Sequence, residues 1–196
     1  MKKNIIVILR VLLCAVIMFM AMSCAAPAAE EKTDVNPPIE KEASEDKTDK
    51  RIYFAGPMFS QGEKDFNLKL VKVLEDHGYE VFLPQRDGIE AALLEGKTAE
   101  EKLKIIFEKD VNEITKADIL VMLIDGRVPD EGACIELGIA YAQGKRCYGL
   151  KTDTRTIQLD LDNNPMIEGC FIRYFKNYSG DKLIEELEQY LSENDL

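Results

Sequence analysis

The alternation of short β-rich runs with longer segments of helical periodicity constrains the fold of this chain more than any other feature. The run at 117–124 (ADILVMLI) is nearly all apolar, which is typical of a strand buried on both faces. Shorter β-rich runs lie at 51–55, 80–83, 146–150 and 171–175. Helical periodicity covers 61–77, 98–115, 131–143 and 181–191, and 87–96 is expected to be a short helix or a loop.

This order of elements predicts a single α/β domain over 51–196. Strands that alternate with helices form a doubly wound parallel sheet with helices on both faces. In such sheets ligands bind beyond the carboxyl ends of the strands. We therefore expect the turn at Gly56, the loop at 126–131 and the start of the helix at 131–143 to surround one crevice.

The helix at 98–115 carries an acid where apolar residues are expected. A capping box of Thr98 and Glu101 starts the helix. Its apolar stripe, which we predict to face the core, comprises Leu103, Ile106, Phe107, Val111 and Ile114. Asp110 falls inside this stripe, and burial of an unpaired carboxylate is costly. Asp110 is therefore bonded by donors or open to a cavity; a rim position with access to water is the alternative.

The helix at 131–143 repeats this anomaly at Glu136. The other residues on the same face are small: Gly132, Ala133 and Ala140. Glu136 lies in the first two turns, where the helix dipole favours the ionised carboxylate that a nucleophile requires. Asp130 stands at the predicted N-cap, and capping alone would explain it. Gly138 in mid-helix is expected to serve close packing.

Convergence of these three acids in one crevice suggests chemistry at a sugar. Two carboxylates at an anomeric carbon can divide the work, one attacking C1′ and another moving protons to and from the leaving group. The same acids could instead hold a divalent cation. A zinc site or a Cys-His dyad is disfavoured, because His77 is the only histidine and no CxxC spacing occurs. We expect no metal and no cofactor.

Two segments resemble a known family. IYFAGPMFS at 52–60 and DGRVPDEGACIELGIAYAQGK at 125–145, together with the helix that carries Asp110, are similar to nucleoside 2-deoxyribosyltransferases. The resemblance implies a flavodoxin-like fold and a double displacement on 2′-deoxynucleosides. In that reaction Glu136 attacks C1′, Asp110 and Asp130 contact and protonate the departing base, and Tyr53 orients Glu136. A free nucleobase, or water, then accepts the deoxyribosyl group.

The resemblance also implies substrate contacts and an assembly. Its first turn supplies Gly56, where the backbone approaches substrate, with Pro57, Met58 and Phe59; the helix start supplies Gly132. Asn164 resembles an asparagine that is lent to the neighbouring subunit's site, although Asn163 is an equally good candidate. A homo-oligomer with shared sites is therefore implied.

Two other functions stay open at this point. One is hydrolysis of 2′-deoxynucleoside 5′-monophosphates, for which the turn GPMFSQGEK offers only Ser60 and Lys64 as phosphate donors. The other is a catalytically inactive surface lipoprotein that binds nucleosides.

The N-terminus predicts export and a lipid anchor. Lys2, Lys3 and Arg10 precede an apolar run at 11–22 that ends at Ser23-Cys24. This run is shorter than the roughly 20 residues that a membrane-spanning helix needs. We interpret 1–23 as a lipoprotein-type signal peptide, Cys24 as the lipidated residue and 24–50 as a disordered tether of the extracytoplasmic domain. An ordinary cleaved signal or an uncleaved anchor is the alternative.

The charge of the chain disfavours one class of partner. The formal net charge is −11, and removal of the signal leaves 22 basic against 36 acidic residues. Such a surface is unsuited to binding a nucleic acid polymer. Beyond Cys24 only Cys134, Cys147 and Cys170 remain, an odd number that argues against a disulfide framework.

Overall fold

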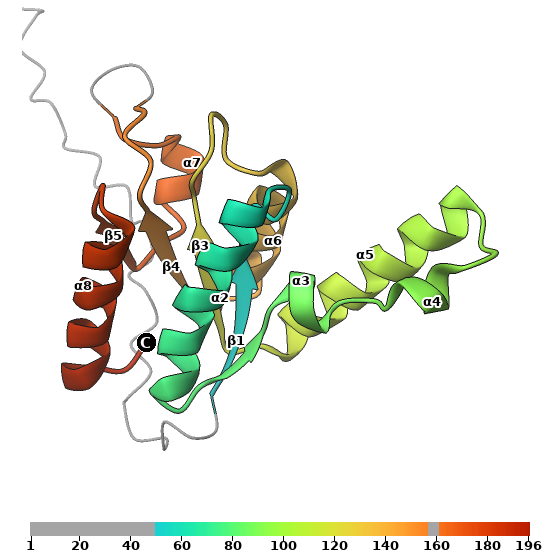
Figure 1. Cartoon of the computed structure of the whole chain (residues 1–196), viewed down its shortest axis with the longest axis horizontal. Helices are drawn as coiled ribbons and strands as arrows, with labels where there is room; N and C mark the ends of the chain where they lie inside the picture. The colour runs from blue at the N-terminus through green and yellow to red at the C-terminus, as the bar shows by residue number, and fades with distance from the viewer. Residues whose placement is uncertain (1–49, 157–160) are drawn as a thin grey trace, which may run out of the picture. The chain divides into compact units, whose positions relative to one another are not determined.

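The computed structural model describes residues 50–156 and 161–196, so the predictions for 1–23 and for most of 24–50 lie outside the described residues. Its sheet has five parallel strands in the order β2-β1-β3-β4-β5 (Figure 1). The strands are β1 (Arg51–Ala55), β2 (Glu80–Phe82), β3 (Ile119–Leu123), β4 (Arg146–Lys151) and β5 (Arg173–Lys176). This is the flavodoxin-like strand order, and it confirms the predicted fold class.

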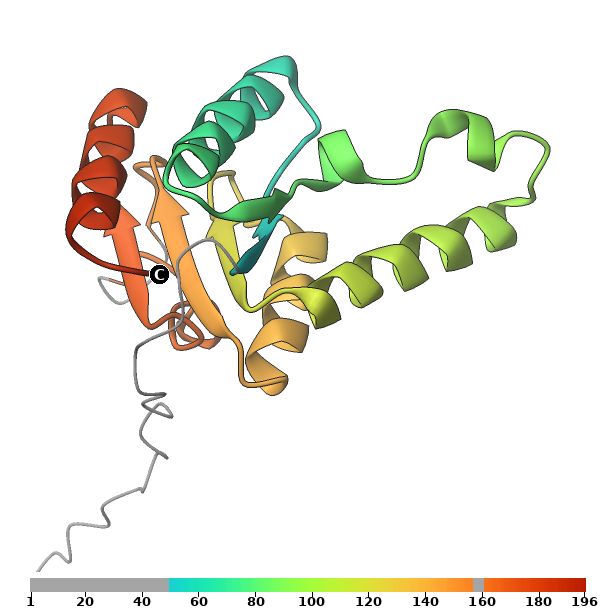
Figure 2. The ribbon, with the colours of Figure 1, turned by 90° about the horizontal axis from the view of Figure 1, so that it is seen from below.

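Helices cover both faces of the sheet (Figure 2). They are α2 (Gln61–Asp76), α3 (Pro84–Asp87), α4 (Ala91–Leu94), α5 (Ala99–Lys116), α6 (Glu131–Ala142), α7 (Pro165–Glu168) and α8 (Gly180–Glu193). Leu70 of α2 and Leu187 of α8 share one core cluster with Ile52. Ile114 of α5 and Leu137 of α6 share the other with Leu120. Because the three central strands, β1, β3 and β4, are buried on both faces, their sequences are nearly continuous apolar runs.

Side-chain caps define where the long helices begin. The capping box of Thr98 and Glu101 is present at α5, and Ser60 forms a second one with Glu63 at α2. These caps satisfy backbone N–H groups that have no partner inside the helix. The short helix α7 was not predicted; Pro165 occupies its first position and Asn164 caps it. Within residues 50–156 and 161–196, no helix combines the length and apolar character needed to cross a membrane.

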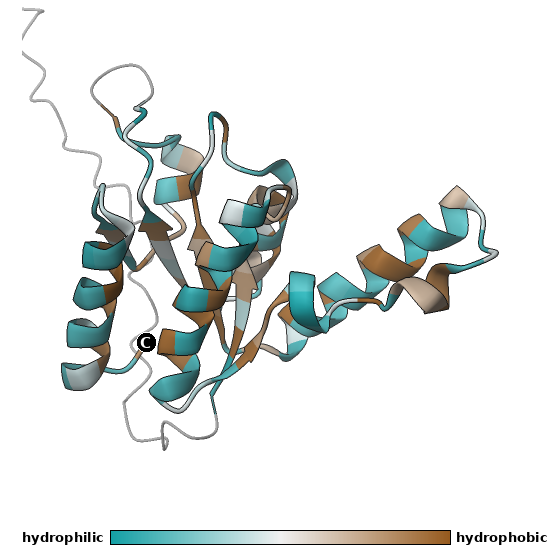
Figure 3. Ribbon diagram, in the orientation of Figure 1, coloured by the Kyte–Doolittle hydropathy of each residue, from teal (hydrophilic) through white to brown (hydrophobic). Residues whose placement is uncertain are grey.

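The predicted burial of the apolar stripe on α5 is wrong. Leu103, Ile106 and Phe107 are 69%, 42% and 58% exposed, whereas Ile114 is 1% exposed. The reason is the direction of α5, whose N-terminal half and the preceding α4 extend away from the sheet (Figures 1 and 2). Only the last turns of α5 reach the core, so the stripe continues along the helix without a partner among residues 50–156 and 161–196 (Figure 3).

Candidate active site

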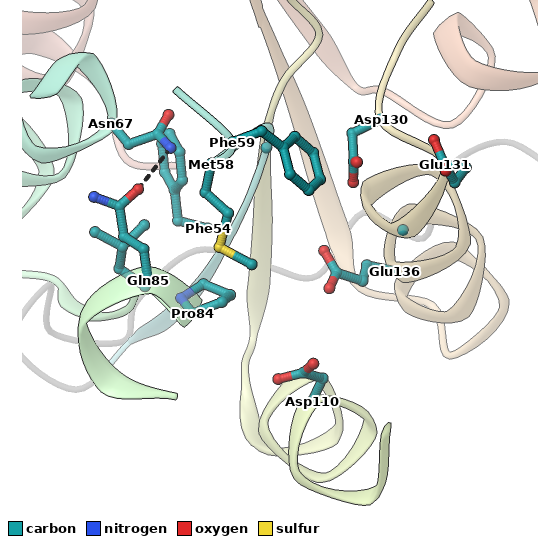
Figure 4. A pocket seen from close by; sticks show the side chains of 13 residues that line it. Phe54, Met58, Phe59, Asn67, Pro84, Gln85, Asp110, Asp130, Glu131 and Glu136 are labelled. Atoms are coloured by element: carbon teal, nitrogen blue, oxygen red, sulfur yellow. Dashed lines mark hydrogen bonds between the residues drawn. The ribbon is translucent and has the colours of Figure 1, made fainter. Parts of the chain in front are cut away.

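A cavity opens beyond the carboxyl ends of β1 and β2 and at the start of α6, on the edge of the sheet where the fold predicts a ligand site (Figure 4). Its volume is about 330 Å³, within the range of small-molecule sites. The lining residues are Phe54, Gly56, Met58, Phe59, Asn67, Leu83, Pro84, Gln85, Asp110, Asp130, Glu131, Gly132 and Glu136. The structure thus brings together the three acids of the sequence prediction, from α5, the N-cap of α6 and α6 itself.

Tyr53 and Glu136 form a hydrogen-bonded pair beside this cavity. Tyr53 is fully buried on β1, and its Oη donates to Glu136 Oε1 at 2.7 Å. The alternation of side chains along β1 turns Tyr53 toward the face that α6 covers, where Glu136 stands in the second turn. The carboxyl group of Glu136 points into the cavity (Figure 4). One oxygen is therefore held by Tyr53 while the group faces the space for a ligand.

The ionisation of Glu136 differs from the sequence prediction. Burial raises the pKa of Glu136 to about 7, and the nearby Asp110 and Asp130 also raise it, whereas the Tyr53 hydrogen bond lowers it. The expected effect of the helix dipole is smaller than the desolvation of a partly buried carboxylate. With a pKa in this range, neutral and ionised forms of Glu136 coexist near pH 7 in the ligand-free site.

Asp110 faces the same cavity across from Glu136 (Figure 4). Burial raises its pKa; Lys109 opposes this shift and Glu113 adds to it. The sequence left open whether Asp110 is bonded by donors, open to a cavity or at a water-accessible rim; in the structure it lines the cavity. A carboxyl group with a raised pKa can carry a proton to a leaving group.

Asp130 combines two roles in the structure: it caps α6 and it lines the cavity. Its Oδ2 accepts a hydrogen bond of 2.7 Å from the backbone N–H of Ala133, so it caps α6. It also lines the cavity beside Glu131 and Gly132. Together with Asp110 and Glu136, the lining includes four carboxylates, and no lysine or arginine belongs to it among the described residues.

The turn after β1 forms the opposite wall. A Cβ added at Gly56 would lie 3.2 Å from Cβ of Leu123, so glycine permits the close approach of this turn to β3. Met58 and Phe59 are exposed and line the cavity, and neither belongs to the core. Pro57 is buried and does not line it; its carbonyl oxygen accepts a hydrogen bond of 2.8 Å from Asn67 Nδ2.

Two amide side chains of the cavity were missed by the sequence prediction. Asn67 Nδ2 donates to Gln85 Oε1 at 2.9 Å, and Gln85 Nε2 donates to the carbonyl of Lys64 at 2.9 Å. Asn67 is buried, and its Oδ1 has no hydrogen-bond partner among the described residues. Gln85 follows the carboxyl end of β2. The rule that ligands bind beyond the carboxyl ends of parallel strands, which located Gly56, could therefore have located Gln85 as well. Asn67 lies within the buried face of α2, where the sequence contains no comparable signal.

The loop between β3 and α6 is held by hydrogen bonds from backbone N–H groups to the carboxylates of Asp125 and Asp153. Asp125 Oδ1 accepts from the N–H groups of Thr152 and Asp153 at 2.7 and 2.9 Å. Gly126 N–H donates to Asp153 Oδ2 at 3.2 Å. Gly126 has φ +131°, and a Cβ there would lie 2.8 Å from the carbonyl oxygen of Val128. This turn needs glycine, and it sets the position from which Asp130 and α6 begin.

Asn163 and Asn164 lie away from the cavity of their own chain. Asn164 is exposed, and its Oδ1 accepts from Met166 N–H at 2.9 Å as the cap of α7. Asn163 is buried, accepts from Lys151 Nζ at 3.0 Å and donates to Glu168 Oε2 at 3.1 Å. Asn163 therefore has a structural role, whereas the exposed Asn164 is accessible to another molecule.

Metal binding and cysteine or histidine chemistry have less support in the described residues. Across 50–156 and 161–196, no group of three or more His, Cys, Asp or Glu side chains is arranged to hold a metal ion. Cys134, Cys147 and Cys170 are free. Burial raises the pKa of Cys147 to about 12, which keeps its thiol protonated and unreactive. His77 caps the end of α2, where its Nδ1 lies 2.8 Å from the carbonyl oxygen of Val73.

Comparisons with known proteins identify a family and similar folds. Residues 52–182 match a family model described as nucleoside 2-deoxyribosyltransferase. A solved structure of a 2-deoxyribosyltransferase from Bacillus psychrosaccharolyticus is 27% identical, with 71% of this chain and 91% of that chain covered and a TM-score of 0.58. A conserved protein from Enterococcus faecalis is 28% identical over 71% and 98% of the chains, with a TM-score of 0.58. No curated protein matches the chain.

Proposed function

The chain belongs to the nucleoside 2-deoxyribosyltransferase family, and from that premise we propose that it cleaves the N-glycosidic bond of 2′-deoxynucleosides through a covalent deoxyribosyl-Glu136 intermediate. The deoxyribosyl group then passes to a second nucleobase or to water. One observation carries the proposal: Glu136, held by Tyr53 at 2.7 Å, points into a cavity that Asp110 and Asp130 also line. Binding alone would not require a partly buried carboxylate held in this way.

The first step forms one bond and breaks one. An oxygen of ionised Glu136 attacks C1′, and the C1′–N bond breaks with its electron pair passing to the base nitrogen. Protonated Asp110, whose pKa burial raises, supplies a proton to the departing base, assisted by Asp130. In the second step a nitrogen of the incoming base attacks C1′, Glu136 departs as a carboxylate, and the proton of that nitrogen returns to the acid.

Tyr53 acts in this proposal as a positioning residue. Burial, and next the charge of Glu136, raise the pKa of Tyr53 well above its usual range, so its hydroxyl stays protonated and donates to Glu136. This hydrogen bond favours the ionised form of Glu136, which is the nucleophilic form. It also directs the other carboxylate oxygen toward the sugar.

The charge of the cavity favours a neutral nucleoside over a 5′-monophosphate. The lining has four carboxylates and, among the described residues, no cationic side chain. Ser60 is engaged in the capping box, where its Oγ accepts from Glu63 N–H at 3.2 Å. A phosphate dianion would meet repulsion from these carboxylates, and neither Ser60 nor Lys64 lines the cavity to offset it. The monophosphate N-hydrolase is therefore the second candidate.

The proposal extends to the cellular setting and the assembly. We place the enzyme outside the cytoplasm, attached through lipid on Cys24, on the support of the apolar run at 11–22 and the following Ser23-Cys24. Loss of membrane-associated lipid label in Cys24→Ser tests this anchor. We also propose a homo-oligomer in which Asn164 enters the neighbouring site, because Asn164 is exposed and lies outside its own cavity.

A base-exchange assay tests the reaction. Purified protein is incubated with a deoxynucleoside, with and without a free acceptor base, and in parallel with the matching 5′-monophosphate. We expect exchange or base release with the nucleoside and abolition by Glu136→Gln, whereas the matched control Glu188→Gln, an exposed residue of α8 outside the cavity, keeps wild-type activity. Faster cleavage of the monophosphate would favour the second candidate. Equal nucleoside binding by wild type and Glu136→Ala, with no base release by either, would indicate an inactive binding protein.

A further inference from the structure

Two lysines occupy the carboxyl ends of neighbouring strands. Lys151 is the last residue of β4 and Lys176 is the last residue of β5, and the two are partners in the parallel register. Lys151 is buried, with only 4% of its surface exposed. Burial of an ammonium group is costly unless its donors are satisfied, so the partners of Lys151 indicate what this side chain holds in place.

Three oxygen atoms surround the ammonium group of Lys151. Its Nζ donates to the carbonyl oxygens of Arg155 at 2.8 Å and Asp162 at 2.7 Å, and to Oδ1 of Asn163 at 3.0 Å. A lysine has three N–H donors, so each of these acceptors can take one of them. All three acceptors are uncharged, and through these contacts Lys151 clamps the chain that follows β4.

The clamp holds the residues directly before Asn164. Asn163 is 3% exposed, and its Nδ2 donates to Glu168 Oε2 at 3.1 Å, so it also joins the start of α7 to its end. Asp162 is held a second time, because its carboxylate pairs with Lys176 Nζ. Positions 162 and 163 are therefore anchored to the ends of β4 and β5, whereas the next residue, Asn164, is exposed at the start of α7.

We propose that Lys151 is a positioning residue for the active site of the neighbouring subunit: by holding Asp162 and Asn163, it fixes the place from which Asn164 reaches the substrate there. This role rests on the proposed function, in which Asn164 enters the neighbouring site. An apolar side chain at 151 would leave three acceptors without their donor, so the chain before Asn164 would shift to find other partners. A shift of about 1 Å in a substrate contact can lower a rate about a hundredfold.

A double-mutant cycle tests the connection between Lys151 and Asn164. The value of kcat/KM for a 2′-deoxynucleoside is measured with the full chain in a mild detergent. We expect Lys151→Met and Asn164→Ala each to lower it about 10- to 100-fold, with the acidic limb of the pH profile in place. The double variant should be no weaker than Asn164→Ala, because Lys151 acts only through that residue.

Lys145→Met is the matched control. Lys145 Nζ also donates to a backbone carbonyl, that of Thr115 at 2.9 Å, but Lys145 precedes β4 and so lies at the amino edge of the sheet. Loss of this lysine removes a similar backbone contact far from the carboxyl ends of the strands. We therefore expect Lys145→Met to keep the wild-type value of kcat/KM.

Mixed oligomers test whether Lys151 acts on the neighbouring site. Chains with Lys151→Met are co-expressed with chains with Glu136→Gln under two different tags, and oligomers that carry both tags are purified. A site that has Glu136 then receives Asn164 from a chain whose Lys151 is intact, so activity should rise about fivefold or more above that of Lys151→Met alone. Co-expression with the double variant Glu136→Gln/Lys151→Met should give no rise.

The outcomes separate the role of Lys151 from the proposed function. A wild type that does not turn over the nucleoside, or a fully active Asn164→Ala, would overturn the proposed function and the role of Lys151 with it. With Asn164→Ala impaired, four results would overturn the role of Lys151 alone: full activity of Lys151→Met, a shifted acidic limb, losses that add in the double variant, or no rise in the mixed oligomers.

Far-ultraviolet circular dichroism checks that each variant is folded. If Lys151→Met does not fold, Asn163→Ala takes its place in both tests, because it removes one acceptor of the clamp and leaves the two carbonyl contacts. Failure of both variants to fold would show that the clamp only stabilises the chain, and would overturn the positioning role.

Discussion

Removal of the Tyr53 hydroxyl should shift the pH dependence of the reaction. In Tyr53→Phe the 2.7 Å hydrogen bond to Glu136 is lost while the buried ring remains. A hydrogen bond to a charged group contributes roughly 1.5–3 kcal/mol, which corresponds to a rise of about one to two in the pKa of Glu136. Since that pKa is about 7 in the wild type, the ionised fraction at pH 7 falls from about one half to between roughly a tenth and a hundredth.

The assay is the rate of base release or exchange, as kcat/KM, between pH 5 and pH 9. We expect the acidic limb of Tyr53→Phe to move to higher pH, with about 5- to 50-fold lower activity at pH 7 and recovery toward the wild-type rate near pH 9. Tyr148→Phe, another buried tyrosine on β4, is the control and should leave the limb in place. An unchanged limb in Tyr53→Phe would refute the coupling between Tyr53 and the ionisation of Glu136.

Four further measurements follow from the structure. Asp110→Asn should slow release of natural bases by about 10²–10⁴-fold while sparing donors whose leaving group needs no proton. Glu136→Gln should be more stable than wild type by roughly 1–3 kcal/mol at pH 8 but not at pH 4, because the raised pKa of Glu136 makes wild-type stability fall as pH rises from about 4.5 to about 7. In urea unfolding, Gly126→Ala should destabilise by about 1–3 kcal/mol, because its φ is +131° and Val128 O would lie 2.8 Å away. Gly138→Ala, with open space around the added Cβ, should stabilise by about 0.5–1 kcal/mol, and a loss instead would restore the predicted packing role.

Much of the fold could be predicted because its signals are local. The apolar run at 117–124 contains β3, and the Thr98–Glu101 capping box marks the start of α5. The direction of α5 was not predictable in the same way. A helical stripe shows that a face is apolar, but it does not show whether the chain or another molecule covers that face.

The acids of the site were predictable because they break an apolar pattern. Asp110 and Glu136 stood out among apolar or small neighbours, and both line the cavity. Asn67 and Gln85 gave no such contrast, since their place in the wall depends on how α2 and the end of β2 meet. The raised pKa of Glu136 likewise follows from burial, a tertiary property, whereas the dipole argument used only its position in α6.

Trapping of the covalent intermediate tests the central claim most directly. A 2′-deoxynucleoside with fluorine on C2′ of the sugar slows hydrolysis of the glycosyl ester, because the fluorine destabilises the cationic transition state at C1′. Peptide mass spectrometry then locates the sugar bound to the protein. We predict one fluorodeoxyribosyl group on the peptide that contains Glu136, absent in Glu136→Gln. Two results would contradict the account. One is base release with the sugar bound to another residue; the other is the absence of protein-bound sugar together with full activity of Glu136→Gln.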